Sequence, residues 1–260
     1  MTEIVFFDFD STLYSHFSHS VPKSVYEAIS ALKDKGIKTC LCTGRCSYEL
    51  ENYFDLSGLH FDYYIFFNGQ AIFDREYNTL FSVTIEGIDK QNAVRIFKEK
   101  KVPIILESKD DYYVNYVDEQ VYHTCVECSS SPVPRVHDYV EDDLYMSSIF
   151  PGKVDDADSF IAENFPNCYT QRWNDGAVDL LLKGHSKAEG IDKLLKMLNI
   201  DIKDTMAFGD AENDAEMMKK VEISVAMGNA EEHIKQISTY VTTHIDDDGI
   251  YNGLKHFNLI

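Results

Sequence analysis

Two carboxylates, Asp8 and Asp10, stand two residues apart directly after the apolar run Ile4 to Phe7. Side chains along a strand alternate between its faces, so both would point the same way if the strand continued through them. Two carboxylates that close repel each other unless a cation lies between them, and hard cations such as Mg²⁺ prefer oxygen ligands. The pair indicates a metal-assisted reaction, with the alternative that one aspartate caps a turn and the other is solvated.

Further polar residues follow three other apolar runs of strand length, at 37–42, 63–67 and 205–208. Ligands of open α/β sheets bind outside the carboxyl ends of the strands, so these residues would gather at one site. Excess carboxylate there requires a metal, while hydroxyl and cationic groups hold phosphoryl oxygens. For Asn68-Gly69 a plain turn is the alternative. The residues after the three runs are Thr43, Gly44 and Arg45, then Asn68 and Gly69, then Asp210, Asn213 and Asp214.

Lys187 is placed where a helix is expected to begin. Ser186 and Glu189 have the spacing of a capping box, which predicts a helix from Lys187 to about Leu198. The helix dipole disfavours a cation in the first turn, and a phosphate bound at the helix N-terminus would compensate. The alternative is a solvated lysine that tolerates a small penalty.

The elements that must position these residues form two kinds of pattern. Continuous apolar strands and intervening helical spacing predict a doubly wound, mainly parallel Rossmann-like sheet in an α/β core formed by 1–81 and 183–260. Between them, short strands of alternating polarity and helical segments predict an inserted α+β domain at 82–182, with one open sheet face.

Composition restricts the partners. The chain has 260 residues and a formal net charge of −20, which argues against nucleic acid and anionic membranes as partners. Six scattered cysteines and the absence of a leader ahead of the first strand predict free thiols and a cytoplasmic protein. Cys125 and Cys128 form a C-x-x-C pair, but no second pair stands at zinc-site spacing. We expect a monomer or weak dimer.

Taken together, these motifs resemble the haloacid dehalogenase superfamily. The sequence Asp8-Phe9-Asp10-Ser11-Thr12 is similar to the first motif of that family, Thr43 to the second, Lys187 to the third, and the segment 209–214 to the fourth. The insert resembles the type IIB cap of the Cof-like sugar-phosphatase branch, as do several short segments: Thr43-Gly44-Arg45, Asn68-Gly69, Met227-Gly228-Asn229-Ala230 and Asp248-Gly249-Ile250.

The resemblance implies a Mg²⁺-dependent phosphatase acting on small phosphorylated metabolites, with sugar phosphates foremost. Asp8 would form an aspartyl-phosphate, and Asp10 would protonate the leaving group and then activate water. Asp8, the Asp10 carbonyl and Asp210 would hold Mg²⁺, with Asp214 and Asn213 orienting those ligands. The phosphate-binding residues would be Thr43 and Lys187, with Arg45 and Asn68 at the rim.

Two other functions and the substrate remain open at this stage. A phosphomutase on the same scaffold differs only in the acceptor of the phosphoryl group. A non-catalytic, phosphate-accepting regulatory module uses a similar acidic pocket, but it needs neither the acid Asp10 nor a cap. Arg172 and Trp173 stand in a polar hairpin of the insert, which makes them candidates for substrate specificity, although Trp173 is equally expected in the core of the cap.

Overall fold

The computed structural model describes residues 2–128, 131–152, 154, 156–174 and 176–260. They form two compact units: Met1–Gly44 with Asp55–Ser82 and His185–Ile260, and Arg45–Phe54 with Val83–Gly184. The second unit contains nearly all of the insert expected at 82–182, but it also takes in residues 45–54, which the sequence analysis places in the core. Local packing accounts for the difference, because Ser47 Oγ donates a hydrogen bond to the carbonyl of Lys109 at 2.9 Å.

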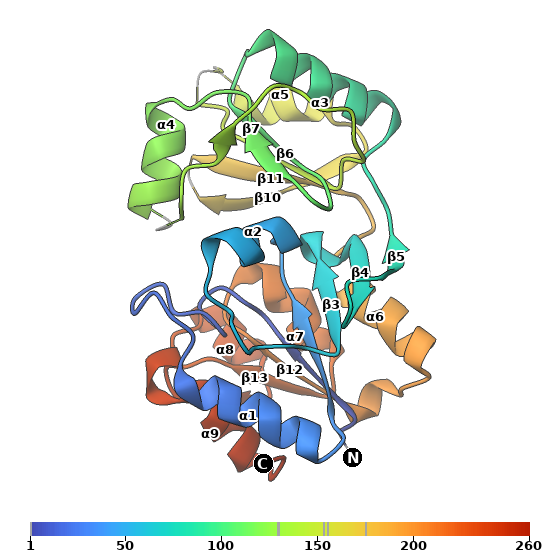
Figure 1. Ribbon diagram of the computed structural model, residues 1–260, viewed down its shortest axis with the longest axis vertical. Helices are drawn as coiled ribbons and strands as arrows, with labels where there is room; N and C mark the ends of the chain where they lie inside the picture. The colour runs from blue at the N-terminus through green and yellow to red at the C-terminus, as the bar shows by residue number, and fades with distance from the viewer. Residues whose placement is uncertain (1, 129–130, 153, 155, 175) are drawn as a thin grey trace. The chain divides into compact units, whose positions relative to one another are not determined.

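The first unit is built on a sheet of eight strands within the described residues (Figure 1). From β14 to β3 all neighbours are parallel, and β4 and β5 extend the edge as antiparallel strands. The strand order is β14 (Tyr240–Val241), β13 (Ile223–Ala226), β12 (Thr205–Gly209), β1 (Ile4–Phe7), β2 (Lys38–Cys42), β3 (Tyr63–Phe66), β4 (Ala71–Asp74) and β5 (Thr79–Ser82).

Helices pack beside this sheet in two groups. One contains α1 next to α9, and the other contains α6 next to α7, which in turn contacts α8. Right-handed crossovers that leave a central strand in opposite directions put their helices on opposite faces, which gives the doubly wound α/β arrangement. The helices are α1 (Lys23–Asp34), α6 (Lys187–Leu198), α7 (Ala215–Lys220), α8 (Glu232–Ile237) and α9 (Gly249–His256).

The central strand β1 is buried along its whole length, as its apolar sequence predicts. The ring of Phe7 stacks on that of Phe208 in the neighbouring strand, with centroids 5.5 Å apart. Helix α1 begins after Pro22, and its chain leaves the helix through Gly36, whose φ of 71° is unfavourable for other residues. These elements fix the position of the segment that follows β1.

The second unit has a sheet of six described strands. All neighbours are antiparallel except β7 and β8, which run parallel. Helices α3 (Gly87–Glu99) and α5 (Ala157–Asn164) pack together against it (Figure 1). The strand order is β10 (Cys168–Asn174), β11 (Ala177–Leu182), β9 (Met146–Ile149), β6 (Ile104–Glu107), β7 (Tyr112–Val114) and β8 (Arg135–Val136).

Each face of this second sheet carries an apolar cluster. Ile104 and Leu106 of β6 belong to the apolar core under α3 and α5, whereas Ile105 belongs to a smaller apolar cluster on the other face. That cluster includes residues of α4 (Glu119–Tyr122) and of the π-helical turn η2 (His123–Cys128) that follows it. The face expected to be open is therefore partly covered. Short α2 (Ser47–Tyr53) completes the unit.

All six cysteines are free thiols, including Cys125 and Cys128 of the C-x-x-C pair. Among the described helices, none combines the length and the apolar character needed to cross a membrane.

Candidate active site

Three neighbouring strands deliver polar side chains to one edge of the first sheet. Asp8 follows β1, Asp210 follows β12 and Thr43 follows β2. Strands β12 and β2 flank β1 in parallel orientation, and the backbone of Asp8 donates to the carbonyl of Phe208 at 3.0 Å. Since adjacent strands lie about 4.8 Å apart, the three residues start from positions within roughly 10 Å of one another.

Lys187 connects two of the predicted carboxylates. Its Nζ lies 2.5 Å from Oδ1 of Asp8 and 2.7 Å from Oδ1 of Asp214, and all three side chains are buried. The second oxygen of Asp214 accepts backbone hydrogen bonds from Asp210 at 2.9 Å and Ala211 at 3.3 Å. Asp214 therefore fixes the loop after β12 and the ammonium of Lys187 at the same time.

The position of Lys187 follows from the capping box. It is the first residue of α6, and the hydroxyl of Ser186 accepts a hydrogen bond from the backbone of Glu189 at 3.4 Å. A lysine in the first turn is unfavourable for the helix dipole. In the structure two carboxylates compensate it, those of Asp8 and Asp214.

Burial dominates the electrostatics of this group. Burial and then the charge of Asp214 raise the pKa of Asp8 to about 7, against the opposing effect of Lys187. Burial, followed by the charges of Asp8 and Asp214, also raises the pKa of Asp210 well above its ordinary value. Burial disfavours the Lys187 ammonium, but Asp214 and Asp8 outweigh it and raise its pKa. The site thus contains more carboxylate charge than its lysine neutralises.

The same carboxylates fit a hard divalent cation. Oxygen atoms of Asp8, Asp210 and Asp214 lie within 4.8 Å of one another. Lys187 occupies Oδ1 of Asp8, and the buried hydroxyl of Thr12 donates to Oδ1 of Asp210 at 2.8 Å. Within the described part of the chain, Oδ2 of Asp8 and Oδ2 of Asp210 accept no hydrogen bond, so both are available as ligands. An all-oxygen set with excess negative charge suits Mg²⁺.

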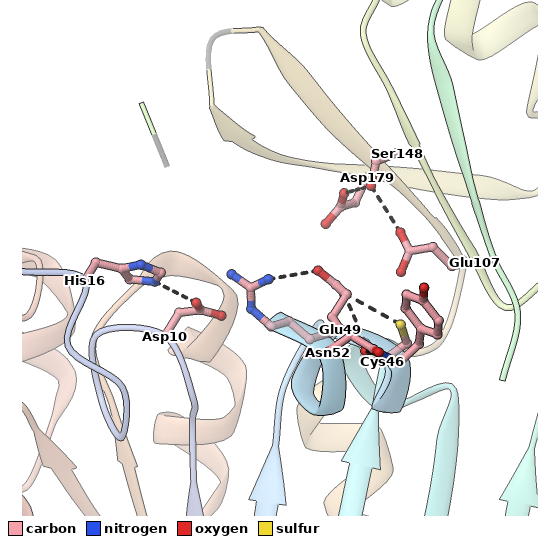
Figure 2. Close-up of polar contacts among 10 residues, drawn as sticks. Asp10, His16, Cys46, Glu49, Asn52, Glu107, Ser148 and Asp179 are labelled. Atoms are coloured by element: carbon pink, nitrogen blue, oxygen red, sulfur yellow. Dashed lines mark hydrogen bonds and ion pairs between the residues drawn. The ribbon is translucent and has the colours of Figure 1, made fainter. Parts of the chain in front are cut away.

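Asp10 has different surroundings from Asp8. The chain leaves the strand after β1 and turns, with Leu13 and Tyr14 donating backbone hydrogen bonds to the carbonyl of Phe9. The expectation that both aspartates point the same way assumed a regular strand, which the structure does not have here. The Asp10 side chain is 36% exposed, and its Oδ1 lies 2.7 Å from Nε2 of His16 (Figure 2).

The segment Asn68-Gly69 is more than a plain turn. Asn68 is buried with φ of 50°, and its backbone donates to the carbonyl of Thr43 at 3.1 Å. A Cβ at Gly69 would lie 2.0 Å from the carbonyl oxygen of Ser186, so only glycine lets this loop contact the start of α6. Asn68 Oδ1 is buried and has no hydrogen-bond partner among the residues that the structure describes. These contacts connect β2, β3 and α6 at the predicted site.

Arg45 and Asn213 are the other two residues predicted from the core motifs. Arg45 belongs to the second unit, where its guanidinium contacts Glu49 at 2.8 Å and the ring of Phe54 at 4.7 Å. Asn213 is half-buried and forms no side-chain hydrogen bond with the described residues. Their roles in binding phosphate and orienting metal ligands stay predictions.

The two specificity candidates lie in β10. Arg172 is 3.6 Å from Asp158, and both side chains are exposed. The side chain of Trp173 lies outside what the structure describes, as does Asp175 beside it. Nothing in the structure tests either specificity role.

The sequence analysis missed a buried polar cluster in the second unit, shown in Figure 2. Ser148 Oγ lies 2.6 Å from Oδ1 of Asp179 and 3.3 Å from Oε1 of Glu107. Oε2 of Glu107 is buried and accepts no hydrogen bond from the described part of the chain. One hydroxyl has one proton and cannot donate to both carboxylates at once. The one available signal is that Glu107 ends an apolar run.

A proton on Glu107 accounts for this arrangement. Burial, then the charges of Glu49 and Asp179, raise its pKa well above the ordinary value. Ligand atoms of Cys46, Glu49 and Glu107 lie within 4.8 Å, but burial also raises the pKa of the Cys46 thiol. Arg45 compensates Glu49. Protons on Glu107 and Cys46, together with Arg45, therefore offset the negative charge of this group. A protonated Glu107 can donate a hydrogen bond to Ser148.

We expect Glu107→Gln to stabilise the protein increasingly as the pH rises. The folded chain holds the Glu107 proton more tightly than the unfolded chain, so wild type loses stability above the unfolded pKa of about 4.3. The loss grows by up to about 1.4 kcal/mol per pH unit until the folded pKa is reached, and glutamine avoids it. Urea unfolding at pH 5, 6.5 and 8 measures the effect, with exposed Glu163→Gln as the control. A constant difference across the pH range would contradict a protonated Glu107.

Comparison with known proteins places the chain in a family. The model of haloacid dehalogenase-like hydrolases matches residues 5–254. YkrA of Bacillus subtilis is 29% identical over 266 residues, which cover 100% of this chain and 99% of YkrA. The solved structure of the subclass IIB sugar phosphatase BT4131 has a TM-score of 0.84 and 30% identity, covering both chains completely. The phosphatase BT1666 from Bacteroides thetaiotaomicron has a TM-score of 0.86 and 28% identity, covering 100% of this chain and 96% of its own.

The family match extends over nearly the whole chain and includes every strand-end motif. The family assignment agrees with the carboxylates at the edge of the first sheet, with the buried side chain of Lys187 and with the doubly wound fold. The chain belongs to the haloacid dehalogenase-like hydrolases and is a phosphatase of that superfamily.

Proposed function

We propose that the protein is a Mg²⁺-dependent phosphatase that hydrolyses phosphomonoesters of small metabolites through a covalent intermediate on Asp8, with sugar phosphates as the expected class. The observation that carries this proposal is the buried Asp8 carboxylate, held at one oxygen by Lys187 and next to the carboxylate of Asp210. Such an arrangement fixes the orientation of the Asp8 carboxylate for attack on phosphorus.

The reaction has two halves. In the first, an oxygen of Asp8 forms a bond to phosphorus while the ester P–O bond breaks and Asp10 gives its proton to the departing oxygen. In the second, Asp10 takes a proton from water as the water oxygen attacks phosphorus and the bond to Asp8 breaks. Asp10 suits this exchange because its side chain is partly exposed and Asp8 is buried.

Cationic groups would offset the charge of the phosphoryl group. The carboxylates of Asp8 and Asp210 and the carbonyl of Asp10 would hold Mg²⁺, which when bound neutralises charge on the phosphoryl oxygens. Asp214 orients this group through its hydrogen bonds to the loop after β12. Lys187 and Thr43 would hold the phosphoryl oxygens, with Asn68 beside Thr43.

The substrate class rests on the similarity to BT4131, which is described as a sugar phosphatase. Family membership disfavours the regulatory module as an alternative. A phosphomutase would use the same residues, and no contact in the structure favours it over hydrolysis. A cytoplasmic location, a monomer or weak dimer, and the absence of nucleic-acid and membrane partners stay predictions from the sequence.

A screen of phosphorylated metabolites with and without Mg²⁺ tests this function. We expect release of inorganic phosphate from at least one sugar phosphate, and from p-nitrophenyl phosphate, only when Mg²⁺ is present. Phosphate analysis and chromatography of the products should be combined. An isomeric sugar phosphate in place of inorganic phosphate would indicate a mutase, and turnover of neither kind of ester would refute the proposal.

A further inference from the structure

His16 contacts Asp10 in a way that nothing in the motif pattern requires. Its Nε2 lies 2.7 Å from Oδ1 of Asp10 (Figure 2). Its ring packs edge-on against that of Tyr14, with centroids 5.3 Å apart. The other ring nitrogen, Nδ1, is buried without a hydrogen-bond partner among the described residues. An ionised carboxylate only accepts hydrogen bonds, and a buried N–H without an acceptor is costly. The contacts therefore favour the tautomer in which Nε2 carries the proton and donates it to Asp10.

The loop that carries His16 is held at several points. Ser11 N donates to the carbonyl of Tyr14 at 2.8 Å, and Ser15 and Ser20 exchange two backbone hydrogen bonds across the loop. From the far end of the chain, Asn229 Nδ2 donates to the carbonyl of Ser11 at 2.8 Å. The backbone of His16 is thus fixed relative to that of Asp10, so the ring can restrict the carboxyl group.

We propose that His16 is a positioning residue for Asp10. By donating to Oδ1, its Nε2–H fixes one oxygen of the carboxyl group and so restricts the orientation in which Asp10 exchanges its proton with the leaving group and with water. The reacting atoms need a defined geometry for efficient proton transfer, and a hydrogen bond to one carboxyl oxygen helps to define it. This inference rests on the proposed function, because it assigns the orientation of the acid in that reaction.

The dependence of rate on the leaving group tests this role. An alkyl ester such as glycerol phosphate needs the proton from Asp10 as its oxygen departs, whereas p-nitrophenolate leaves readily without one. In His16→Asn the amide is too short to reach Oδ1 of Asp10, so we expect kcat/KM for glycerol phosphate to fall at least about tenfold, with little change for p-nitrophenyl phosphate. Acid-quench measurements should show slower hydrolysis of the Asp8 intermediate with both esters.

Two further variants separate positioning from structural damage. His16→Gln can place an amide N–H near the position of Nε2 and should restore the ratio of the two rates to within about threefold of wild type. His19→Asn changes an exposed histidine of the same loop, which has φ of 51° and tolerates asparagine, and should leave the ratio unchanged.

Three outcomes overturn the inference. They are an equal loss of kcat/KM on both esters in His16→Asn, no loss on either ester, and a glutamine variant as impaired as the asparagine variant. If wild type hydrolyses neither a sugar phosphate nor p-nitrophenyl phosphate with Mg²⁺, the proposed function itself fails and the inference fails with it. An active wild type with an unchanged ratio in His16→Asn removes only the role of His16.

Discussion

Asp8→Asn is expected to reduce phosphatase activity at least about 10⁴-fold while the chain stays folded. The amide keeps the shape of the side chain and can still contact Lys187, so the packing around β1 is preserved. It lacks the nucleophilic oxygen that forms the bond to phosphorus, and it removes one negative charge from the acidic site. Lys187 keeps Asp214 as an ion-pair partner at 2.7 Å, so its buried charge remains compensated.

Acid quenching during turnover tests the covalent step directly. With labelled substrate, wild type should retain label on the protein and Asp8→Asn should not. Asp192→Asn is the matched control, since Asp192 pairs with Lys220 at 2.5 Å in another carboxylate–lysine contact of the same unit. An Asp8→Asn variant that keeps more than a few per cent of wild-type activity would rule out Asp8 as the nucleophile.

The residues whose place at one edge of the sheet follows from the sequence are those fixed by short-range rules. Asp8, Thr43 and Asp210 follow continuous apolar runs, and in a parallel sheet the ends of such strands must meet at one edge. Lys187 follows a capping serine, which determines where α6 begins. In each case a few neighbouring residues specify the element, and the topology of the sheet then brings the ends together.

His16 could not be located in this way. Its position depends on the path of a loop in which Ser11 adopts φ of 58°, and on Asn229, which is 218 residues away in the sequence. The turn contains two histidines, and nothing in their spacing distinguishes the one that contacts Asp10.

The cluster of Glu107, Ser148 and Asp179 was missed for a related reason. These residues come from three strands, and they meet only because β9 pairs with both β6 and β11 in one particular register. A shift of one residue would turn any of them to the opposite face of the sheet. The assignment of residues 45–54 to the second unit likewise depends on contacts with residues more than 50 positions away, such as that of Ser47 with Lys109.

Asp210→Asn should weaken Mg²⁺ binding at least about tenfold, because it removes one anionic ligand. EDTA should abolish the activity of wild type, because it removes the cation that compensates the clustered carboxylates. Asparagine keeps an oxygen that can accept from Thr12, so the loop after β12 is retained. Titration calorimetry with Mg²⁺ alone measures the affinity without relying on turnover. Asp247→Ala, at an exposed position of the short turn η5 (Ile245–Asp247), controls for the loss of one negative charge from the protein.

When metal is absent, Asp210→Asn should stabilise the folded protein. Burial and the charges of Asp8 and Asp214 raise the folded pKa of Asp210, so ionisation of this group above its unfolded pKa of about 3.9 destabilises the folded chain. In EDTA at pH 8, Asp210→Asn should therefore unfold at a higher temperature than wild type, and the difference should shrink as the pH falls toward 4. Added Mg²⁺ should reverse the order, because it stabilises only the protein that binds it. A variant less stable than wild type in EDTA at pH 8 would mean that Asp210 is compensated within the folded chain and that the acidic edge has no need of a cation.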